Sequence, residues 1–481
     1  MKKNEKTVEK NYIYNLGYQI LVMIVPLITT PYVSRVLGAD GVGIYSFTSS
    51  IVSYFVLFGN FGIATYGQLC IAAERENKKR MTEEFWGIYF ARMFLMLICM
   101  AVYLLYILFQ KQYRTMYLVL ILQLAASAVD ISWLLQGLEE FKKIVLRNAV
   151  VKLLGVALIF LLVKEKKDLY IYATIMQGAV LIGNLSIYAF LREFLLPVSA
   201  KEIRIFKHIR PSIQYFIPTI ATSVYMLLDK SMIGWITHSE LENGYYEQAQ
   251  KIEQMAVTVV TSLSVVTLPR MTLLFKQKKK EEMVQRLHGS IQFILWISLP
   301  MAAGIAGIAP NLIPWFLGKG YEPCVNLLCI FSVLIIVIGL NNAVGKQVLM
   351  PIGKQKEYNY AVICGAMVNV VCNVFLIPAL QSVGAAIASV AAETVILFAF
   401  LKYSSEYITA KIIIKYAMKN MIASTVTGIA VGYSCRYFAS SLVGLVLQVV
   451  MGMLCYIVVL ILLRDPFTIE QIRKYRTILK K

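Results

Sequence analysis

The stretch LVGLVLQVVMGMLCYIVVLILL, residues 442–463, contains no charged residue. A helix that crosses roughly 30 Å of hydrocarbon needs about 20 apolar residues, and this stretch is long enough. Lipid offers no hydrogen-bond partner to the peptide groups, so we expect a helix, which satisfies them within the segment. Similar runs recur along the whole chain, and they predict an all-α polytopic membrane protein.

The composition agrees with this prediction. Hydrophobic residues make up 58% of the 481 residues and charged residues 15%, and the mean hydropathy is +0.67. A soluble domain is nearer to about 45–50% apolar and about 25% charged. The excess of apolar side chains needs a lipid environment to cover it.

Apolar runs that are separated by charged residues predict about fourteen transmembrane helices. They lie near residues 12–34, 44–70, 85–109, 115–138, 148–163, 169–191, 212–237, 249–275, 289–313, 324–350, 359–378, 384–402, 416–438 and 442–463. With the amino terminus in the cytoplasm, inner segments hold 34 Lys and Arg residues and outer segments hold 8. The positive-inside rule therefore predicts that both termini are cytoplasmic.

The formal charge of +20 does not predict nucleic-acid binding. The basic residues lie on short loops at one face, where they set topology and meet anionic lipid headgroups. The sequence also lacks a P-loop, a GxSxG motif and a GxGxxG motif after a strand. Its eight cysteines form no CxxC pair, and its three histidines are isolated. We therefore expect no enzyme activity, no catalytic residues, no metal site and no cofactor.

Weak internal symmetry indicates how the chain is divided. Residues 31–35 (PYVSR) and 41–45 (GVGIY) in the first half resemble residues 227–230 (LLDK) and 243–246 (NGYY) in the second. Transporters are often built from such repeats and bind substrate between them. The predicted organisation has four parts: a six-helix amino-terminal lobe at 1–191, a cytoplasmic linker at 192–211, a six-helix carboxy-terminal lobe at 212–402, and a helix pair with a cytoplasmic tail at 403–481.

Ionisable residues inside the predicted spans are the candidate functional residues. Each costs about 2.5–3.5 kcal/mol near the bilayer centre, so such residues usually face a bundle interior or a watery cavity. One interpretation is a cavity whose cations suit an anionic group, since Arg and Lys both bind phosphate. The other is that they snorkel to the interface or form structural pairs. The residues are Arg35, Arg92, Asp130, Lys152, Asp229, Lys230, Lys251, Glu253, Lys346 and Glu393.

Several motifs, taken in order along the chain, resemble bacterial polysaccharide flippases of the Wzx type. They are NYIYN at 11–15, PYVSRVLG at 31–38, GVGIYSF at 41–47, FGIATYG at 61–67, DISW at 130–133, LDKSMIG at 228–234, GYY at 244–246, QVLMPIG at 347–353 and GAAIASVAAE at 384–393. The resemblance implies the fold of the multidrug/oligosaccharidyl-lipid/polysaccharide exporter superfamily. It also implies movement of an undecaprenyl-pyrophosphate-linked oligosaccharide from the inner to the outer leaflet of the cytoplasmic membrane.

A charged pyrophosphate and hydrated sugars cannot cross hydrocarbon unaided, so a polar cavity is expected to carry them while the lipid tail stays in the bilayer. We predict that Arg35, Arg92 and Lys230 bind the pyrophosphate. Asp130, Asp229 and Glu393 are candidates for the cavity wall or for ion coupling. Expected partners are the lipid-linked glycan, membrane lipids, a polysaccharide polymerase and glycosyltransferases.

Three alternatives remain open at this point. A lipid II flippase or a MATE-class exporter of drugs and cations would share the fold. An exporter of cations should favour acidic residues within its spans, whereas basic ones are at least as common here. A membrane glycosyltransferase or polymerase would require an acidic catalytic pair on a substantial external loop, which the sequence lacks.

Overall fold

The computed structural model describes residues 2–479. The side chains at 1–16, 18–20, 200, 217–218, 221–226, 263, 265–266 and 475–481 are not described. The motif at residues 11–15 therefore lies outside the described side chains. The chain folds into two compact units, Met1–Ser231 and Met232–Lys481.

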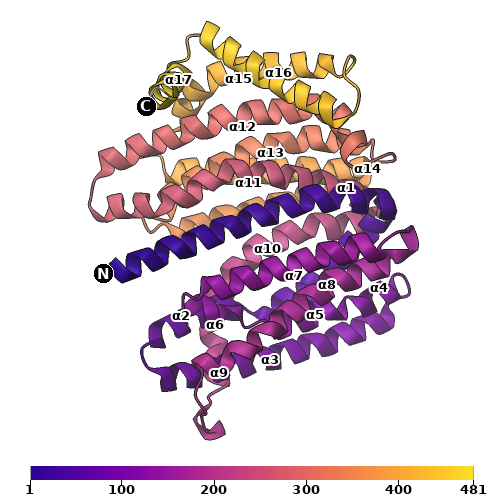
Figure 1. The fold of residues 1–481 in the computed structure, drawn as a ribbon, viewed down its shortest axis with the longest axis vertical. Helices are drawn as coiled ribbons and strands as arrows, with labels where there is room; N and C mark the ends of the chain where they lie inside the picture. Colours follow the sequence, from indigo (N-terminus) through magenta and orange to yellow (C-terminus); the bar gives the residue numbers. More distant parts are fainter. Residues whose placement is uncertain (1, 480–481) are drawn as a thin grey trace. The chain divides into compact units, whose positions relative to one another are not determined.

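The first unit is built from helices throughout its described length (Figure 1). Its α-helices are α1 (Lys2–Asn60), α2 (Ile63–Glu74), α3 (Lys78–Phe109), α4 (Arg114–Val119), α5 (Ile121–Ala128), α6 (Ser132–Gly137), α7 (Phe141–Leu162), α8 (Leu169–Ser186) and α9 (Leu191–Phe194). Short 3-10 turns are η1 (Lys166–Asp168), η2 (Ile187–Phe190), η3 (Ala200–Glu202) and η4 (Phe206–His208). The helix α10 (Ile209–Thr237) begins in this unit and ends in the next.

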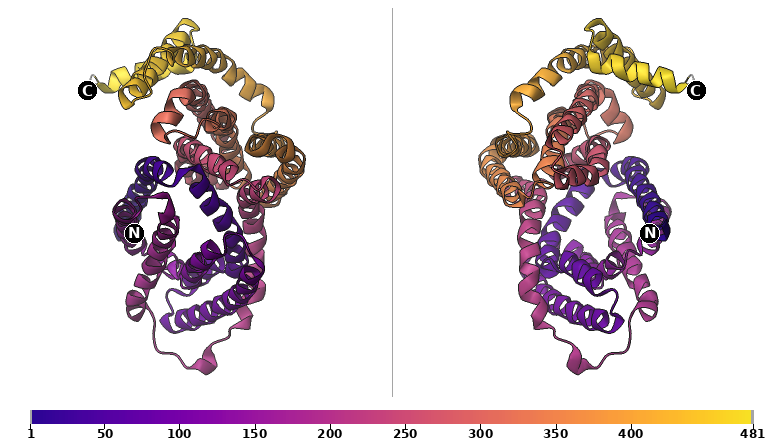
Figure 2. Two further views of the ribbon diagram at one scale, coloured as in Figure 1. Left: turned by 90° about the vertical axis from the view of Figure 1, so that its right-hand side faces the viewer. Right: turned by 90° about the vertical axis from the view of Figure 1, so that its left-hand side faces the viewer.

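The second unit is also helical along the part that the structure describes. It contains α11 (Glu240–Lys276), α12 (Lys280–Phe316), α13 (Cys324–Val344), the π-helical turn η5 (Gly345–Leu349), α14 (Gln355–Tyr403), α15 (Ala410–Ser434), α16 (Leu442–Leu462) and α17 (Pro466–Leu479). Helix α15 packs against both α12 and α16, and α16 packs against α17. Figure 2 shows α15 to α17, coloured from orange to yellow, lying together at one end of this unit.

Two helices are much longer than one membrane crossing because each contains a break. The backbone of α1 leaves helical geometry at Gly38 (φ 72°), and that of α14 does so at Gln381 (φ 54°). The first break lies between the spans predicted at 12–34 and 44–70. The second lies between those predicted at 359–378 and 384–402.

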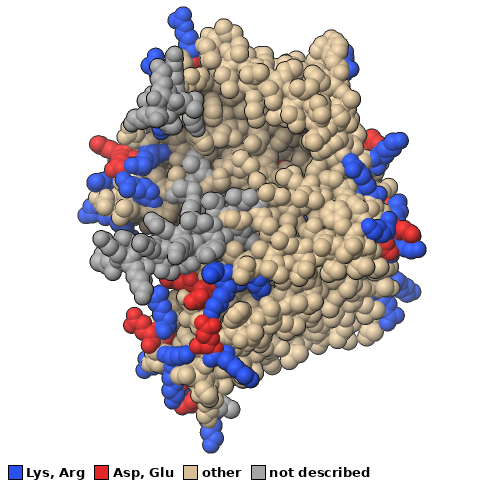
Figure 3. All heavy atoms as spheres, in the orientation of Figure 1, with Lys and Arg blue, Asp and Glu red and all other residues tan. Residues whose placement is uncertain are grey.

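The prediction of a polytopic all-α protein is confirmed at the level of helices and apolar spans. Nine helical segments among the described residues are long and apolar enough to cross a membrane, and there are ten if the bent pair Glu240–Ser262 and Thr267–Lys276 is one span. On the face of the first unit drawn in Figure 3, charged side chains gather at the helix ends and the flanks between them are uncharged. The number fourteen, the lobe boundaries and the cytoplasmic termini stay predictions.

The segment predicted as a linker, 192–211, is fastened to the first unit. Lys79 pairs with Glu202 at 2.8 Å, and Lys207 pairs with Glu84 at 2.6 Å. The Tyr66 hydroxyl lies 3.1 Å from Nδ1 of the buried His208. Burial lowers the pKa of this imidazole and so favours its neutral form. The segment is thus held to α2 and α3 by contacts on several of its residues.

Gly62 joins α1 to α2 in a conformation that only glycine adopts easily. Its φ is +72°, and a Cβ there would lie 2.6 Å from the backbone nitrogen of Phe216 and 2.7 Å from the carbonyl oxygen of Ser212. Strain at such a position costs on the order of 1–3 kcal/mol, and here backbone atoms would also have to move.

We expect Gly62→Ala to lower the apparent melting temperature of the purified protein by several degrees. The matched control is Gly178→Ala in α8, where a Cβ meets no atom within 4 Å and alanine favours the helix. Thermal unfolding followed in detergent micelles measures both variants. Equal melting temperatures for the two would contradict the tight junction at Gly62.

Candidate functional site

Arg92 on α3 lies at a meeting point of three helix ends in the first unit. Its side chain is only 2% exposed. Its Nη2 donates to Asn60 Oδ1 at the end of α1 and to the carbonyl oxygen of Ser127 near the end of α5. Both distances are 2.6 Å. Nη1 donates to the carbonyl oxygen of Asp130. A cation is favourable here because the last carbonyls of a helix carry partial negative charge.

Asp130 lies beside Arg92, which agrees with the interpretation that ionisable residues form structural pairs. Its carboxylate, however, accepts a hydrogen bond from another group. Its Oδ1 accepts a hydrogen bond of 2.9 Å from the backbone nitrogen of Ser132. This is a local turn that starts α6. The guanidinium meets the backbone of Asp130, and the two charges also attract each other. The structure therefore brings Arg92 and Asp130 together at the junction of α5 and α6.

Arg35 lies on a different face of its helix from the residues that anchor α1. Val33, Ser34 and Leu37 are buried, whereas Arg35 is exposed. The hydroxyl of Tyr32 donates to the carbonyl oxygen of Val163 at 2.6 Å and fixes this part of α1 against the end of α7. Arg35 thus projects from a firmly held stretch of helix, one turn before the break at Gly38.

Asp229 and Lys230 are consecutive on α10, so their side chains leave the helix about 100° apart. Asp229 is buried, at 3% exposure, and Lys230 is half-buried. The next residue, Ser231, lies 2.8 Å from the hydroxyl of Tyr54 on α1. Asp229 interacts electrostatically with that same tyrosine. Asp229 therefore belongs to the polar packing between α1 and α10.

Glu393 on α14 is a polar centre of the second unit. The amide Nδ2 of Asn341 on α13 donates to its carboxylate Oε2 at 2.6 Å and to its carbonyl oxygen at 3.0 Å. Glu253 on α11 interacts with Glu393 electrostatically. Three helices that are distant in sequence thus contribute to one polar cluster.

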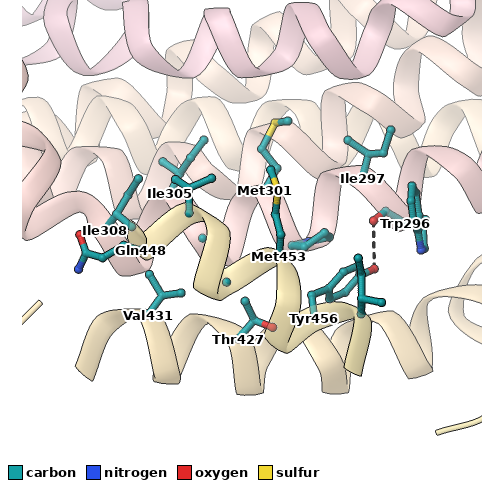
Figure 4. Close-up of a pocket in the computed structure, with 15 residues that line it drawn as sticks. Trp296, Ile297, Met301, Ile305, Ile308, Thr427, Val431, Gln448, Met453 and Tyr456 are labelled. Carbon is teal, nitrogen blue, oxygen red and sulfur yellow. Dashed lines mark hydrogen bonds between the residues drawn. The ribbon is translucent and has the colours of Figure 1, made fainter. Parts of the chain in front are cut away.

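An apolar groove of about 400 Å³ lies between α12, α15 and α16 of the second unit. Figure 4 shows Met301 from α12 and Met453 from α16 in the space between these helices. Gly304 and Gly452 leave room in its wall. Its lining residues are Trp296, Ile297, Pro300, Met301, Gly304, Ile305, Ile308, Thr427, Val431, Gln448, Val449, Gly452, Met453, Tyr456 and Ile457.

The polar atoms at the ends of this groove are engaged by the protein itself. The Tyr456 hydroxyl donates to the carbonyl oxygen of Trp296 at 3.0 Å (Figure 4). The Gln448 amide donates to Ser434 Oγ at 3.0 Å. What remains along the wall is aliphatic, thioether and aromatic surface, which suits a hydrocarbon chain.

The groove and the amides that hold the charged residues were not predicted from the sequence. Asn60 follows a long apolar run, and Asn341 and Asn342 interrupt another. A polar amide inside or at the end of an apolar run is the sequence signal that could have identified these residues. The groove has no such signal, since its residues come from three segments that are individually ordinary membrane helices. Only their packing creates the space.

Two family models match long parts of the chain. The polysaccharide biosynthesis protein family matches residues 8–275, and the lipid II flippase MurJ family matches residues 147–452. The protein named "Putative O-antigen transporter" from Escherichia coli is 23% identical over 410 residues, which cover 82% of this chain and 96% of that protein. A lipid II flippase MurJ from Bacillus subtilis is 27% identical over 188 residues, which cover 38% of this chain and 34% of that protein.

Solved structures show the same fold. A lipid II flippase MurJ in an inward closed conformation matches with a TM-score of 0.76 and 13% identity, covering 94% of this chain and 99% of that one. An outward-facing multidrug resistance MATE transporter matches with a TM-score of 0.53 and 14% identity, covering 83% and 94%. These likenesses show that the chain shares the fold of these two proteins.

The polysaccharide biosynthesis model covers more than half of the chain, and the motifs, the apolar helices and the fold agree with it. The chain therefore belongs to the polysaccharide biosynthesis protein family and is a Wzx-type flippase of the multidrug/oligosaccharidyl-lipid/polysaccharide exporter superfamily.

Proposed function

We propose that this flippase moves an undecaprenyl-pyrophosphate-linked oligosaccharide from the inner to the outer leaflet of the bacterial cytoplasmic membrane, by alternating access. The observation that carries the proposal is the family match over residues 8–275, together with the O-antigen transporter that aligns along 82% of the chain. The glycan would then serve surface polysaccharide synthesis, with a polymerase and glycosyltransferases as partners.

The pyrophosphate requires cations, and two cationic side chains of the first unit support this part of the proposal. Arg35 is exposed and Lys230 is half-buried, so both are accessible enough to meet a ligand. Arg offers phosphate a bidentate set of donors and Lys a compact charge. Direct contact of Arg92 with phosphate also stays a prediction. Arg92 donates to the carbonyl oxygens of Ser127 and Asp130, and it would have to release them in order to donate to phosphate oxygens. Asp130, Asp229 and Glu393 stay candidates for the cavity wall or for ion coupling.

The polyprenyl tail requires an apolar path, and the groove between α12, α15 and α16 supports this part of the proposal. Its volume of about 400 Å³ accommodates a segment of the tail while the rest remains in the bilayer. The tail is already out of water in the bilayer, so van der Waals packing against the groove wall, and not the hydrophobic effect, would hold it there. We propose that the groove holds the tail near the protein while the headgroup crosses.

Lipid II transport is a second candidate, favoured by one specific observation. The MurJ family model covers residues 147–452, and the MurJ structure matches with a TM-score of 0.76. Lipid II has the same pyrophosphate and tail and differs in its sugars and peptide. A leaflet assay in sealed proteoliposomes separates the two, because each lipid is offered alone and its exposure to an external enzyme is measured.

In that assay we expect protein-dependent translocation of the lipid-linked oligosaccharide and little of lipid II. Translocation of lipid II alone would assign the protein to peptidoglycan synthesis. No translocation of either lipid, with efflux of a cationic dye, would contradict the flippase proposal.

Arg35→Ala and Lys230→Ala should each lower the initial rate of translocation by about 10–100-fold, the range expected for loss of one charge-assisted hydrogen bond. Membrane abundance should stay normal, because neither side chain is buried. The control Lys166→Ala removes an exposed partner of Asp40 and should transport normally. Wild-type rates in both test variants would exclude them as phosphate ligands.

Arg92→Ala should lower both transport and the apparent melting temperature. The carbonyls of Ser127 and Asp130 lose their buried donor, and each unsatisfied group costs about 1–3 kcal/mol. Arg92→Lys keeps the charge but cannot reach all three oxygens with one ammonium group, so we expect partial recovery. Thermal unfolding and the leaflet assay are measured on the same preparations. Full stability with lost transport in Arg92→Ala would instead support direct phosphate contact.

Filling the groove should slow transport without harming the fold. Gly304 lines the groove, and a Cβ at this position meets no atom within 4 Å, so the side chain of Gly304→Leu starts in open space. The matched control is Gly289→Leu, on the same helix but outside the groove and also open. We expect a several-fold lower rate for Gly304→Leu and an unchanged rate for Gly289→Leu. Equal rates would mean that the groove does not hold the tail.

A further inference from the structure

Another groove, here called the linker groove, lies in the first unit between α3 and the segment predicted as a linker. Its volume is about 620 Å³. Its lining includes Trp86 and Phe90 of α3 and Leu196 and Ile203 of the linker segment. One charged side chain, Arg192 of α9, also lines it, and the remaining lining residues are aliphatic. The linker groove is therefore amphipathic, and no part of the transport proposal uses it.

Hydrogen bonds hold α3 and the linker segment together beside this groove. The backbone nitrogen of Leu196 donates to Oγ1 of Thr82 on α3 at 3.1 Å. The ammonium group of Lys78, at the start of α3, donates to the carbonyl oxygen of Glu193 at 3.0 Å. Leu196 itself lines the groove, and Glu193 is the neighbour of another lining residue. The linker groove is thus pre-formed, as sites for small ligands usually are.

Arg192 gives the linker groove a positive charge that is available to a ligand. The side chain is exposed, and it forms no hydrogen bond or ion pair with any residue that the structure describes. The acid next to it in sequence, Glu193, pairs instead with Lys143 at 2.7 Å. Lys143 also lies over the ring of Phe194, 4.4 Å from its centroid. Beside the groove, basic side chains thus outnumber acidic ones, and this arrangement attracts an anion.

The linker groove extends from a charged helix end to an apolar helix flank. Helix α3 begins at Lys78 and is long and apolar enough to cross a membrane. Trp86 and Phe90 lie about two and three turns into this helix, at 3.6 residues per turn. Arg192 lies close to the end of another candidate span, Lys166–Phe194. Aromatic rings from within one span and a guanidinium from the end of another therefore line the same groove.

We propose that the linker groove binds an anionic phospholipid of the cytoplasmic leaflet, such as phosphatidylglycerol. The guanidinium of Arg192 donates to the lipid phosphate, which it can meet with two parallel hydrogen bonds. An acyl chain packs against Trp86, Phe90 and the aliphatic residues. Basic pockets beside membrane helices bind anionic headgroups in this way. A zwitterionic lipid would bring its own cation next to Arg192, and an apolar peptide segment would leave the guanidinium without an anion.

Tryptophan fluorescence tests this site, because bromine atoms on an acyl chain quench an indole that they contact. The purified full-length protein in neutral detergent micelles is titrated with phosphatidylglycerol or phosphatidylcholine, each carrying brominated chains. The part of the quenching that Trp86→Phe abolishes reports this groove among the five tryptophans of the chain. We expect half-maximal quenching of Trp86 at an about fivefold lower mole fraction of phosphatidylglycerol, the effect of about one basic side chain near anionic lipid. The transported lipid is absent, so the result does not depend on the transport proposal.

Arg192→Ala should remove this preference for phosphatidylglycerol, and Arg192→Lys should restore most of it. The matched control is Arg80→Ala, which removes an exposed cation at the start of α3 that does not line the groove. This control should keep the wild-type preference. Equal quenching of Trp86 by the two lipids, or an undiminished preference in Arg192→Ala, would overturn the site. An equal loss in Arg80→Ala would reduce it to a diffuse charge effect, and displacement of the lipid by free glycerol phosphate would make it a site for a soluble anion.

Discussion

The peptide groups of a chain in lipid must be satisfied within the protein, and the architecture follows from this constraint. Continuous helices meet it by themselves. Each break exposes carbonyls and amides that need side-chain partners. In the first unit, Arg92 donates to the carbonyls of Ser127 and Asp130. In the second, the carboxylate of Glu242 accepts from the backbone nitrogen and hydroxyl of Ser382, directly after the break at Gln381. At both places, a side chain thus satisfies backbone groups where a helix ends or breaks.

The helical architecture could be predicted from sequence because hydrophobicity over a window of about 20 residues is a strong signal. The breaks in α1 and α14 also had local signals, since each falls between two predicted spans. The segment 192–211 was less predictable. Its composition reads as a linker, yet pairs such as Lys207 with Glu84 fasten it to α3. Such pairs join residues that are 123 positions apart, and no local pattern reports them.

The candidate site was predictable only in part. An ionisable residue inside an apolar run is visible in the sequence, and Arg92, Asp229 and Glu253 were found in this way. What each one contacts depends on packing. Arg92 is engaged by backbone oxygens, Asp229 lies in the packing near Tyr54, and Glu253 faces Glu393. The same sequence signal therefore marks a hydrogen-bonded arginine, a packing contact and a buried acid. The apolar groove could not be found, since its shape arises from three helices.

The hydrogen bonds that Arg92 donates to Asn60, Ser127 and Asp130 have a consequence for how the protein is made. The chain enters the membrane from the amino terminus, and Arg92 is synthesised before the carbonyl of Asp130, which follows 38 residues later. At about 5–20 residues per second, the ribosome needs about 2–8 s to supply it. During that interval the guanidinium has only Asn60, already synthesised, as its eventual partner. Helix α3 thus enters the bilayer while Arg92 still lacks most of its hydrogen-bond partners. Its final packing requires that α5 and the start of α6 have been synthesised.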